Sequence, residues 1–153
     1  HMLDTLDKNI LTELQRDARI SNTELARRIN LSPPATLTRV KRLEKDGFIQ
    51  NYAAIINRQK AGYDLLCFIS VSLQLHDTDQ VTGFIKIIQE MSEVLECHHV
   101  TGEYDYLLKV VTRNTEDLEH FLMHRLTPVS GVARIHTNLV LREAKSTSEI
   151  PLK

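Results

Sequence analysis

The sequence lacks the features that mark several classes of protein. No apolar run among its 153 residues approaches the roughly 18 residues that a membrane-spanning helix needs. The two cysteines, Cys67 and Cys97, are not spaced like a pair of metal ligands, and no secretory signal is visible. We therefore expect a protein with no membrane span, located in the cytoplasm, with both thiols reduced.

Signatures of catalysis are missing as well. The sequence contains no G-x-S-x-G, no P-loop, no Rossmann fingerprint and no HExxH. His120 and His124 have the spacing of a metal pair on a helix, but two ligands without a third make a weak site. His98 and His99 are neighbours on an expected strand and would point to opposite faces. We predict no catalytic residues, no cofactor and no metal, and keep an amino-acid-binding enzyme as an alternative.

Positive charge is concentrated in one short segment, although the formal net charge of the chain is only −1. Residues 19–45 hold seven Lys or Arg against two Glu, a local net charge of +5. A basic stripe of this kind can bind phosphate even on a protein that is nearly neutral as a whole. This segment is therefore the candidate for nucleic-acid binding.

Two short helices joined by about three residues are predicted in the same segment. Ser21 followed by Glu24 predicts a capping box, in which the serine caps the helix start and the glutamate reaches back. Ser32 can cap the next helix, and Pro33 takes its first position, where a missing N–H costs nothing. Gly47 suits the end of that second helix. The arrangement is a helix-turn-helix motif.

The second helix of this motif has two predicted faces. Leu37, Val40 and Leu43 are expected to face the core, which leaves a polar side exposed. Such a side can contact bases and phosphates in a major groove. The alternatives are a solvated charged face on a three-helix unit, or a motif that mediates only protein contacts. The predicted DNA-contacting residues are Ser32, Pro34, Ala35, Thr36, Thr38, Arg39, Lys41, Arg42 and Lys45.

After Phe48 the pattern of apolar residues changes from helical spacing to alternating strands and helices. Residues 49–56 are predicted to form a wing strand. TDQVTGFI (78–85) resembles TEDLEHFL (115–122) at an offset of 37 residues, which suggests two βαβ halves in series. We predict a βαββαβ unit, a four-stranded antiparallel sheet with both helices on one face. The expected strands are 65–75, 95–101, 104–112 and 132–141, and the expected helices are 78–91 and 115–126.

Four stretches in order resemble the Lrp/AsnC family, the leucine-responsive or feast/famine group of transcriptional regulators. They are LDKNILTELQRDARIS (6–21), LSPPATLTRVKRLEKDGFI (31–49), VTGEYDYLL (100–108) and LREAKSTSEIPL (141–152). The resemblance implies an α+β protein: a winged helix-turn-helix domain at 3–50, a hinge strand and linker at 51–64, and a ferredoxin-like (ACT-like) βαββαβ domain at 65–153. The last domain would bind an effector and form oligomers.

The resemblance also implies a function, partners and a second site. The chain would be a sequence-specific regulator that binds double-stranded DNA and a small amino acid, and forms homodimers that assemble further into octamers. The effector would bind near the TGxxD loop, where Gly102 permits close approach of a ligand and Asp105 can pair with an ammonium group. A plain hairpin turn in which Asp105 caps its own backbone is the alternative. The implied effector residues are Thr101, Gly102, Glu103, Tyr104 and Asp105, with Ala133, Arg134, Ile135, His136 and Thr137 as pocket wall.

Overall fold

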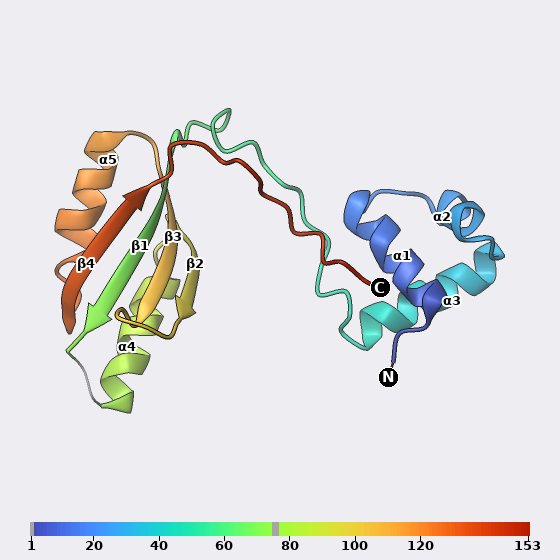
Figure 1. The fold of residues 1–153 in the computed structure, drawn as a ribbon, viewed down its shortest axis with the longest axis horizontal. Coiled ribbons are helices and arrows are strands. Elements are labelled where there is room, and N and C mark those ends of the chain that lie inside the picture. The colour runs from blue at the N-terminus through green and yellow to red at the C-terminus, as the bar shows by residue number, and fades with distance from the viewer. Residues whose placement is uncertain (1, 75–76) are drawn as a thin grey trace. The chain divides into compact units, whose positions relative to one another are not determined.

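The computed structural model describes residues 2–74 and 77–153, which divide into two compact units (Figure 1). The helical unit comprises the residues up to Ile55 together with Ala144–Lys153. The sheet unit comprises Ile56–Glu143. Within the described residues, no helix has the length and apolar character needed to cross a membrane.

The helical unit is built on three helices, α1 (Thr5–Arg16), α2 (Asn22–Ile29) and α3 (Pro33–Lys45). Their apolar faces meet in one core, where Ile10 and Leu43 have no exposed surface. Helix α1 begins with a full capping box between Asp4 and Asp7. Burial of the helices' apolar faces against one another, rather than helix propensity alone, stabilises helices of this length.

The predicted wing strand is absent, because residues 49–56 form no strand. Ile49 packs against the helical core, but Ile55 and Ile56 are largely exposed. A strand needs a neighbour to satisfy its backbone groups, and no strand among the described residues pairs with this segment. The alternation in the sequence was therefore not sufficient to predict pairing.

The segment Ala144–Lys153 belongs to the helical unit, whereas the sequence analysis placed it in the second domain. Gln15 Nε2 donates to the carbonyl oxygen of Ile150 at 3.1 Å, and Ile150 N donates to Gln15 Oε1 at 2.6 Å. Arg16 forms an ion pair with Glu149 at 2.6 Å, and Leu152 packs against the helical core. The residues joined by these contacts with α1 are more than 130 positions apart in the sequence, so no local pattern predicts the contacts.

The sheet unit has the predicted βαββαβ order, and its four strands pair antiparallel in the order β2-β3-β1-β4. The N-caps of its two helices are Asp77 and Asn114, the same offset of 37 residues that the sequence repeat shows. Leu75, the last residue of the first predicted strand, lies outside the described residues. The elements are β1 (Leu65–Leu73), α4 (Thr78–Gln89), β2 (Val94–His99), β3 (Tyr106–Thr112), α5 (Thr115–His120) and β4 (Val132–Leu139).

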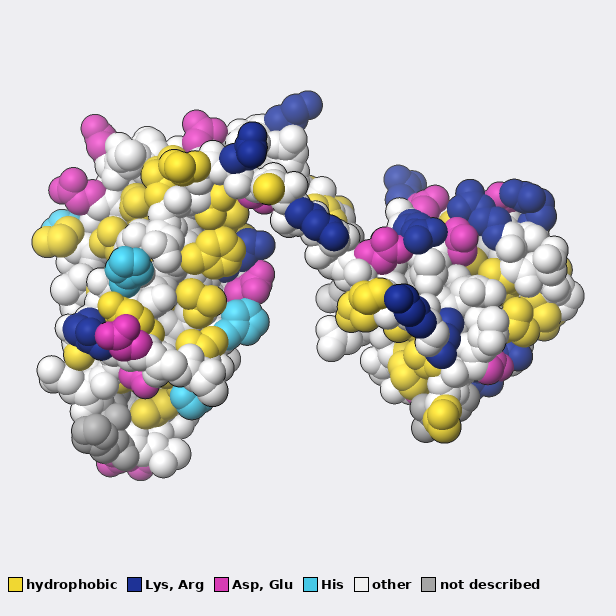
Figure 2. All heavy atoms as spheres, in the orientation of Figure 1, with side chains coloured by type: hydrophobic (Ala, Val, Ile, Leu, Met, Phe, Trp, Pro, Cys, Tyr) yellow, Lys and Arg dark blue, Asp and Glu magenta, His cyan; other side chains and the backbone are white. Residues whose placement is uncertain are grey.

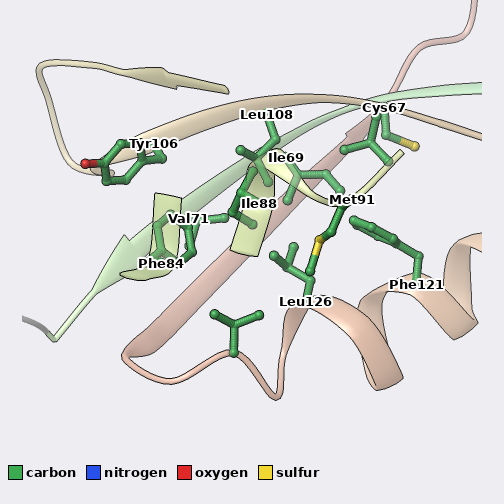
Figure 3. Packing of buried hydrophobic residues seen from close by; sticks show 12 residues of the cluster. Cys67, Ile69, Val71, Phe84, Ile88, Met91, Tyr106, Leu108, Phe121 and Leu126 are labelled. Carbon is green, nitrogen blue, oxygen red and sulfur yellow. The ribbon is translucent and has the colours of Figure 1, made fainter. Parts of the chain in front are cut away.

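Both helical segments of the sheet unit cover the same face of the sheet. Alternate residues of β1 and β3, such as Ile69 and Leu108, point at Phe84 of α4 and at Phe121 (Figure 3). The helix predicted over 115–126 changes its turn at Phe121, where α5 continues as a wider π-helix (Phe121–Leu126). Within the described residues of the sheet unit, no helix covers the opposite face of the sheet.

Candidate nucleic-acid interface and effector loop

The start of α2 has half of the predicted capping box. Ser21 Oγ accepts a hydrogen bond from Glu24 N at 3.1 Å, as predicted. The Glu24 carboxylate does not reach back, because it accepts hydrogen bonds from Arg27 and Arg28 instead. These two arginines lower the pKa of Glu24 to about 2. Asn30 ends the helix in the left-handed conformation, at φ 56°, which asparagine adopts more readily than most residues.

Helix α3 begins as predicted, but its core face is rotated from the predicted one. Ser32 Oγ accepts from Ala35 N at 3.4 Å, and Pro33 takes the first position. Thr36, predicted to be exposed, has no exposed surface, and its hydroxyl donates to the Ser32 carbonyl oxygen at 2.9 Å. Leu37, predicted to be buried, is 42% exposed. A threonine whose hydroxyl is satisfied within its own helix can be buried as an apolar residue is.

The two arginines predicted to contact DNA do not extend freely from α3. Arg39 Nη1 donates to both carboxylate oxygens of Asp4, at 2.9 and 2.7 Å, and to Asp7 Oδ1 at 3.1 Å. Arg42 Nη2 donates to the same Asp7 oxygen at 2.8 Å. Asp7 is fully buried, and sequence reasoning missed it because its partners lie more than 30 residues away. We call this group the clamp; it consists of Asp4, Asp7, Arg39 and Arg42.

The residues that α3 does expose form a stripe. Pro34, Thr38, Lys41 and Lys45 are spaced four, three and four residues apart, so they lie on one side of the helix. Both lysines are exposed and form no ion pair with any described residue. Ser32 is also exposed at the helix start, and Ala35 is half-buried. Figure 2 shows the Lys and Arg side chains of the helical unit interspersed with Asp and Glu, as the ion pairs require.

The loop between β2 and β3 contains the residues predicted for the effector. Thr101, Gly102 and Glu103 are exposed, and Gly102 has φ +110°, a conformation that L side chains rarely adopt. Asp105 Oδ2 accepts from Leu73 N at 2.7 Å, next to the irregular pairing at the end of β1. The carboxylate thus braces a neighbouring strand, and Oδ1 accepts no hydrogen bond from a described residue.

Part of the predicted pocket wall meets this loop. The guanidinium carbon of Arg134 lies 5.0 Å from the centre of the Tyr104 ring, and Arg134 Nη1 lies 3.8 Å from Glu103 Oε1. The rings of Tyr104 and His136 are 6.2 Å apart. Ala133 is exposed. Ile135 packs against the core cluster, and Thr137, two residues further along β4, lies on the same face of the sheet. The alternating residues Arg134 and His136 are therefore the ones that the structure brings to the loop.

Other potential ligands do not gather into a metal site. The described residues contain no group of three or more His, Cys, Asp or Glu side chains that could hold a metal ion. The rings of His120 and His124 lie 5.0 Å apart without a third ligand. His98 bonds Glu96, whereas His99 stacks on Tyr106 beside a 480 Å³ pocket between α4 and β2 that the sequence did not indicate.

Comparison with known protein families shows to which family the chain belongs. Residues 3–50 match the winged helix-turn-helix DNA-binding model, and residues 66–150 match the Lrp/AsnC ligand binding domain. The chain belongs to the Lrp/AsnC family. The leucine-responsive regulatory protein of Escherichia coli (strain K12) is 40% identical over 151 residues, which span 99% of this chain and 92% of that protein. Members of this family are transcriptional regulators, so the enzyme alternative is not supported.

Solved structures of Lrp/AsnC regulators have the same fold. A transcriptional regulator of Neisseria meningitidis, determined as a complex with L-Met, superimposes with a TM-score of 0.95 at 35% identity and covers 98% of this chain and 97% of its own. AsnC of Escherichia coli superimposes with a TM-score of 0.90 at 26% identity, over 99% of this chain and 100% of its own. The predicted fold class and family are thereby confirmed.

Proposed function

We propose that this Lrp/AsnC regulator binds duplex DNA through the exposed stripe of α3, and that an amino acid bound at the 101–105 loop controls that binding. The observation that carries the proposal is the contact of Glu103 and Tyr104 with Arg134 and His136, next to the exposed backbone of Gly102. This contact occurs inside the domain that matches the family's ligand-binding model. A similar regulator was solved with L-Met, which supports an amino acid as the class of ligand.

The loop offers groups for both ends of an amino acid. The backbone around Gly102 is exposed, and its N–H groups can hold a carboxylate, as can the guanidinium of Arg134. Asp105 Oδ1 can take the ammonium group while Oδ2 keeps its bond to Leu73. Glu103, which is exposed, is a second partner for the ammonium.

On DNA, the exposed stripe is the face of α3 that fits a major groove. Lys41 and Lys45 supply charge, and Thr38 supplies a hydroxyl that can contact a base or a phosphate. The N-terminus of α3 offers a phosphate the hydroxyl of Ser32 and the positive end of the helix dipole. It offers no free backbone N–H in its first turn, because its first two residues are prolines and the next two N–H groups are bonded to Ser32. Thr36 is buried and does not contact DNA. The clamp arginines are held by Asp4 and Asp7.

Assembly completes the proposal. The sheet face without helices carries both polar and apolar side chains, since Ser70 pairs with His136 and Phe68 with Asn138, and hydrophobic and His side chains are visible on the sheet unit in Figure 2. We place a homodimer contact there, with dimers forming a larger ring, as in an octamer. Two-fold symmetry would set two α3 helices on half-sites about one helical turn apart or a multiple of it. The cytoplasm, where the chromosome lies, is the location that this role requires.

The effector site is tested by substitutions that separate the charge of Asp105 from its structural bond. A thermal-shift screen of the twenty amino acids, beginning with L-methionine and L-leucine, identifies the ligand, and calorimetry measures its affinity. Asp105→Asn keeps an oxygen for Leu73 N but removes the charge, so we expect binding to fall at least tenfold with little loss of stability. The exposed Asp79→Asn is the matched control. Wild-type affinity in Asp105→Asn would place the ammonium site elsewhere.

DNA binding is tested with the chain's own promoter region in a gel shift. The double variant Lys41→Met, Lys45→Met should lose most of its affinity, because each lost phosphate or base contact costs roughly 1–3 kcal/mol. Lys86→Met, an exposed lysine of α4, is the control for removal of charge alone. Light scattering at micromolar concentration tests the assembly, and a monomer would refute the proposed dimer.

A further inference from the structure

We infer that the two acidic residues of the clamp are positioning residues of the DNA-binding unit: they keep both clamp arginines from the DNA phosphates, so that Lys41 and Lys45 make the charged contacts of α3. The inference rests on the proposed DNA-binding role of α3. It adds to that role a statement of which basic side chains of α3 reach the DNA and which residues hold the other basic side chains back.

The buried carboxylate is the first reason. The side chain of Asp7 is 1% exposed, so water cannot replace its partners, Arg39 Nη1 at 3.1 Å and Arg42 Nη2 at 2.8 Å. If both arginines left for phosphates, this buried charge would have no guanidinium partner, which is strongly unfavourable. The pairing therefore favours conformations in which both guanidiniums stay on α1.

The exposed carboxylate is the second reason. Both oxygens of Asp4 accept hydrogen bonds from Arg39 Nη1, and this interaction lowers the pKa of Asp4 to about 2. The group is therefore ionised at neutral pH. Its side chain is 55% exposed, so its negative charge also repels a phosphate that approaches Arg39.

The distribution of ion pairs is the third reason. Residues 19–45 hold seven basic residues, of which two belong to the clamp. Arg27 and Arg28 pair with Glu24 at 2.6 and 3.1 Å. Among the described residues, the basic side chains of this segment that form no ion pair are Arg19, Lys41 and Lys45.

The consequence is a difference in how α3 reads DNA. Arginine offers a planar fork that matches a guanine edge, whereas lysine is a compact point charge. With its arginines held by the clamp, the charged part of α3 serves mainly to position the helix against phosphates. Base recognition then depends more on Thr38 and on the exposed apolar residues Pro34 and Leu37, which can contact a thymine methyl group.

The salt dependence of DNA binding tests this assignment, because it counts phosphate contacts and a purely structural role would not move it. The probe is a 30-base-pair duplex of mixed sequence, about 30 pairs being enough to cover two half-sites one turn apart. Lys41→Met and Lys45→Met should each reduce the slope of log K against log salt by about 0.9 per helix on the DNA. Arg39→Met and Arg42→Met should leave the slope unchanged. Each arginine variant leaves Asp7 one arginine partner, so the fold should persist.

A variant of Asp4 gives the opposite result. Asp4→Asn keeps the N-cap, because asparagine caps a helix as well as aspartate does. Without the negative charge Arg39 can reach a phosphate while Arg42 stays on Asp7. For each helix on the DNA, the slope should then steepen by about 0.9, and affinity should rise about eightfold at 0.1 M salt. Asp4→Glu, which restores the charge, should return the wild-type slope.

The outcomes are decisive in both directions. A slope that falls in Arg39→Met or Arg42→Met as it does in Lys41→Met would show that the arginine contacts phosphate, and would overturn the inference. An unchanged slope in Asp4→Asn would equally show that Asp4 does not hold Arg39 back. Circular dichroism confirms that each variant is folded. If the wild-type protein itself shows no salt-sensitive binding to the duplex or to its promoter region, the proposed function fails, and this is a different result from either of the above.

Discussion

Helix α3 and the 101–105 loop both contain many polar residues, but these differ in how far they are already bonded to other side chains of the protein. On α3 the two arginines are bound to carboxylates of α1, and one of those carboxylates is buried. In the loop, Thr101, Gly102 and Glu103 are exposed, and only Asp105 is bonded firmly, to the end of β1. The two arginines of α3 are thus already paired before any ligand arrives, whereas the loop keeps most of its groups available.

The difference shows why residue type alone is a poor guide to a binding surface. An arginine on a recognition helix is a good candidate for a DNA contact until its partners are known. The partners of Arg39 and Arg42 lie on a different helix, and only the folded unit brings them together. A turn such as 101–105 is defined by neighbouring residues, so its character is easier to predict from the sequence.

The largest expected effect is a loss of stability limited to the unit whose core residue is truncated. Phe121→Ala should lower the free energy of unfolding of the sheet unit by about 3–5 kcal/mol, because it removes a fully buried aromatic side chain. Hydrogen exchange should show loss of protection in β1 and β3 and unchanged protection in α1–α3. Leu43→Ala is the matched variant for the helical unit and should do the reverse. Equal losses in both units would mean that they unfold as one.

A smaller effect is expected from a comparison of the buried, bonded Asp7 with the exposed Asp46. Asp7→Asn keeps a hydrogen-bond acceptor but removes the charge that both clamp arginines share, and should cost the helical unit about 1–3 kcal/mol. Asp46→Asn, an exposed carboxylate at the end of α3, should cost much less. Denaturant titrations measure both. If the two variants are equally stable, the clamp contributes little to the fold.

Much of the fold was predictable from the sequence, and the failures have one cause. The helix starts at Asn22 and Pro33, the chain order βαββαβ and the repeat of 37 residues depend on local patterns, and all were confirmed. The burial of Thr36 and the exposure of Leu37 were mispredicted, and the ion pairs of the clamp arginines were not foreseen, because residues on other helices set these environments. The contacts of the final segment, 144–153, with α1 were not predictable for the same reason.

That final segment gives a third, modest effect. Gln15→Ala removes both hydrogen bonds with Ile150, so we expect a loss of about 0.5–1.5 kcal/mol in the stability of the helical unit. Exchange of the amides of residues 149–152 should become faster at the same time. The exposed Gln50→Ala is the control from the same unit. Unchanged exchange would show that these residues are held by other contacts, such as that of Leu152.

The smallest expected effect concerns how stability depends on pH. This dependence should be stronger in the helical unit than in the sheet unit. The pKa values of Asp4 and Glu24 fall from the ordinary 3.8 and 4.5 to about 2, in each case mainly through hydrogen bonds from arginines. Because the folded values are lower than the unfolded ones, the stabilisation is present above about pH 4.5 and is lost as the pH falls towards 2. Both carboxylates are exposed, so solvent and salt screen the effect and keep it small. The double variant Asp4→Asn, Glu24→Gln should be less stable than the wild type at pH 6, and the difference in melting temperature should shrink steadily between pH 4.5 and 2. A difference that stays constant over this range would show that the ion pairs of the two carboxylates contribute nothing to stability, and that their role is confined to holding the arginines away from DNA.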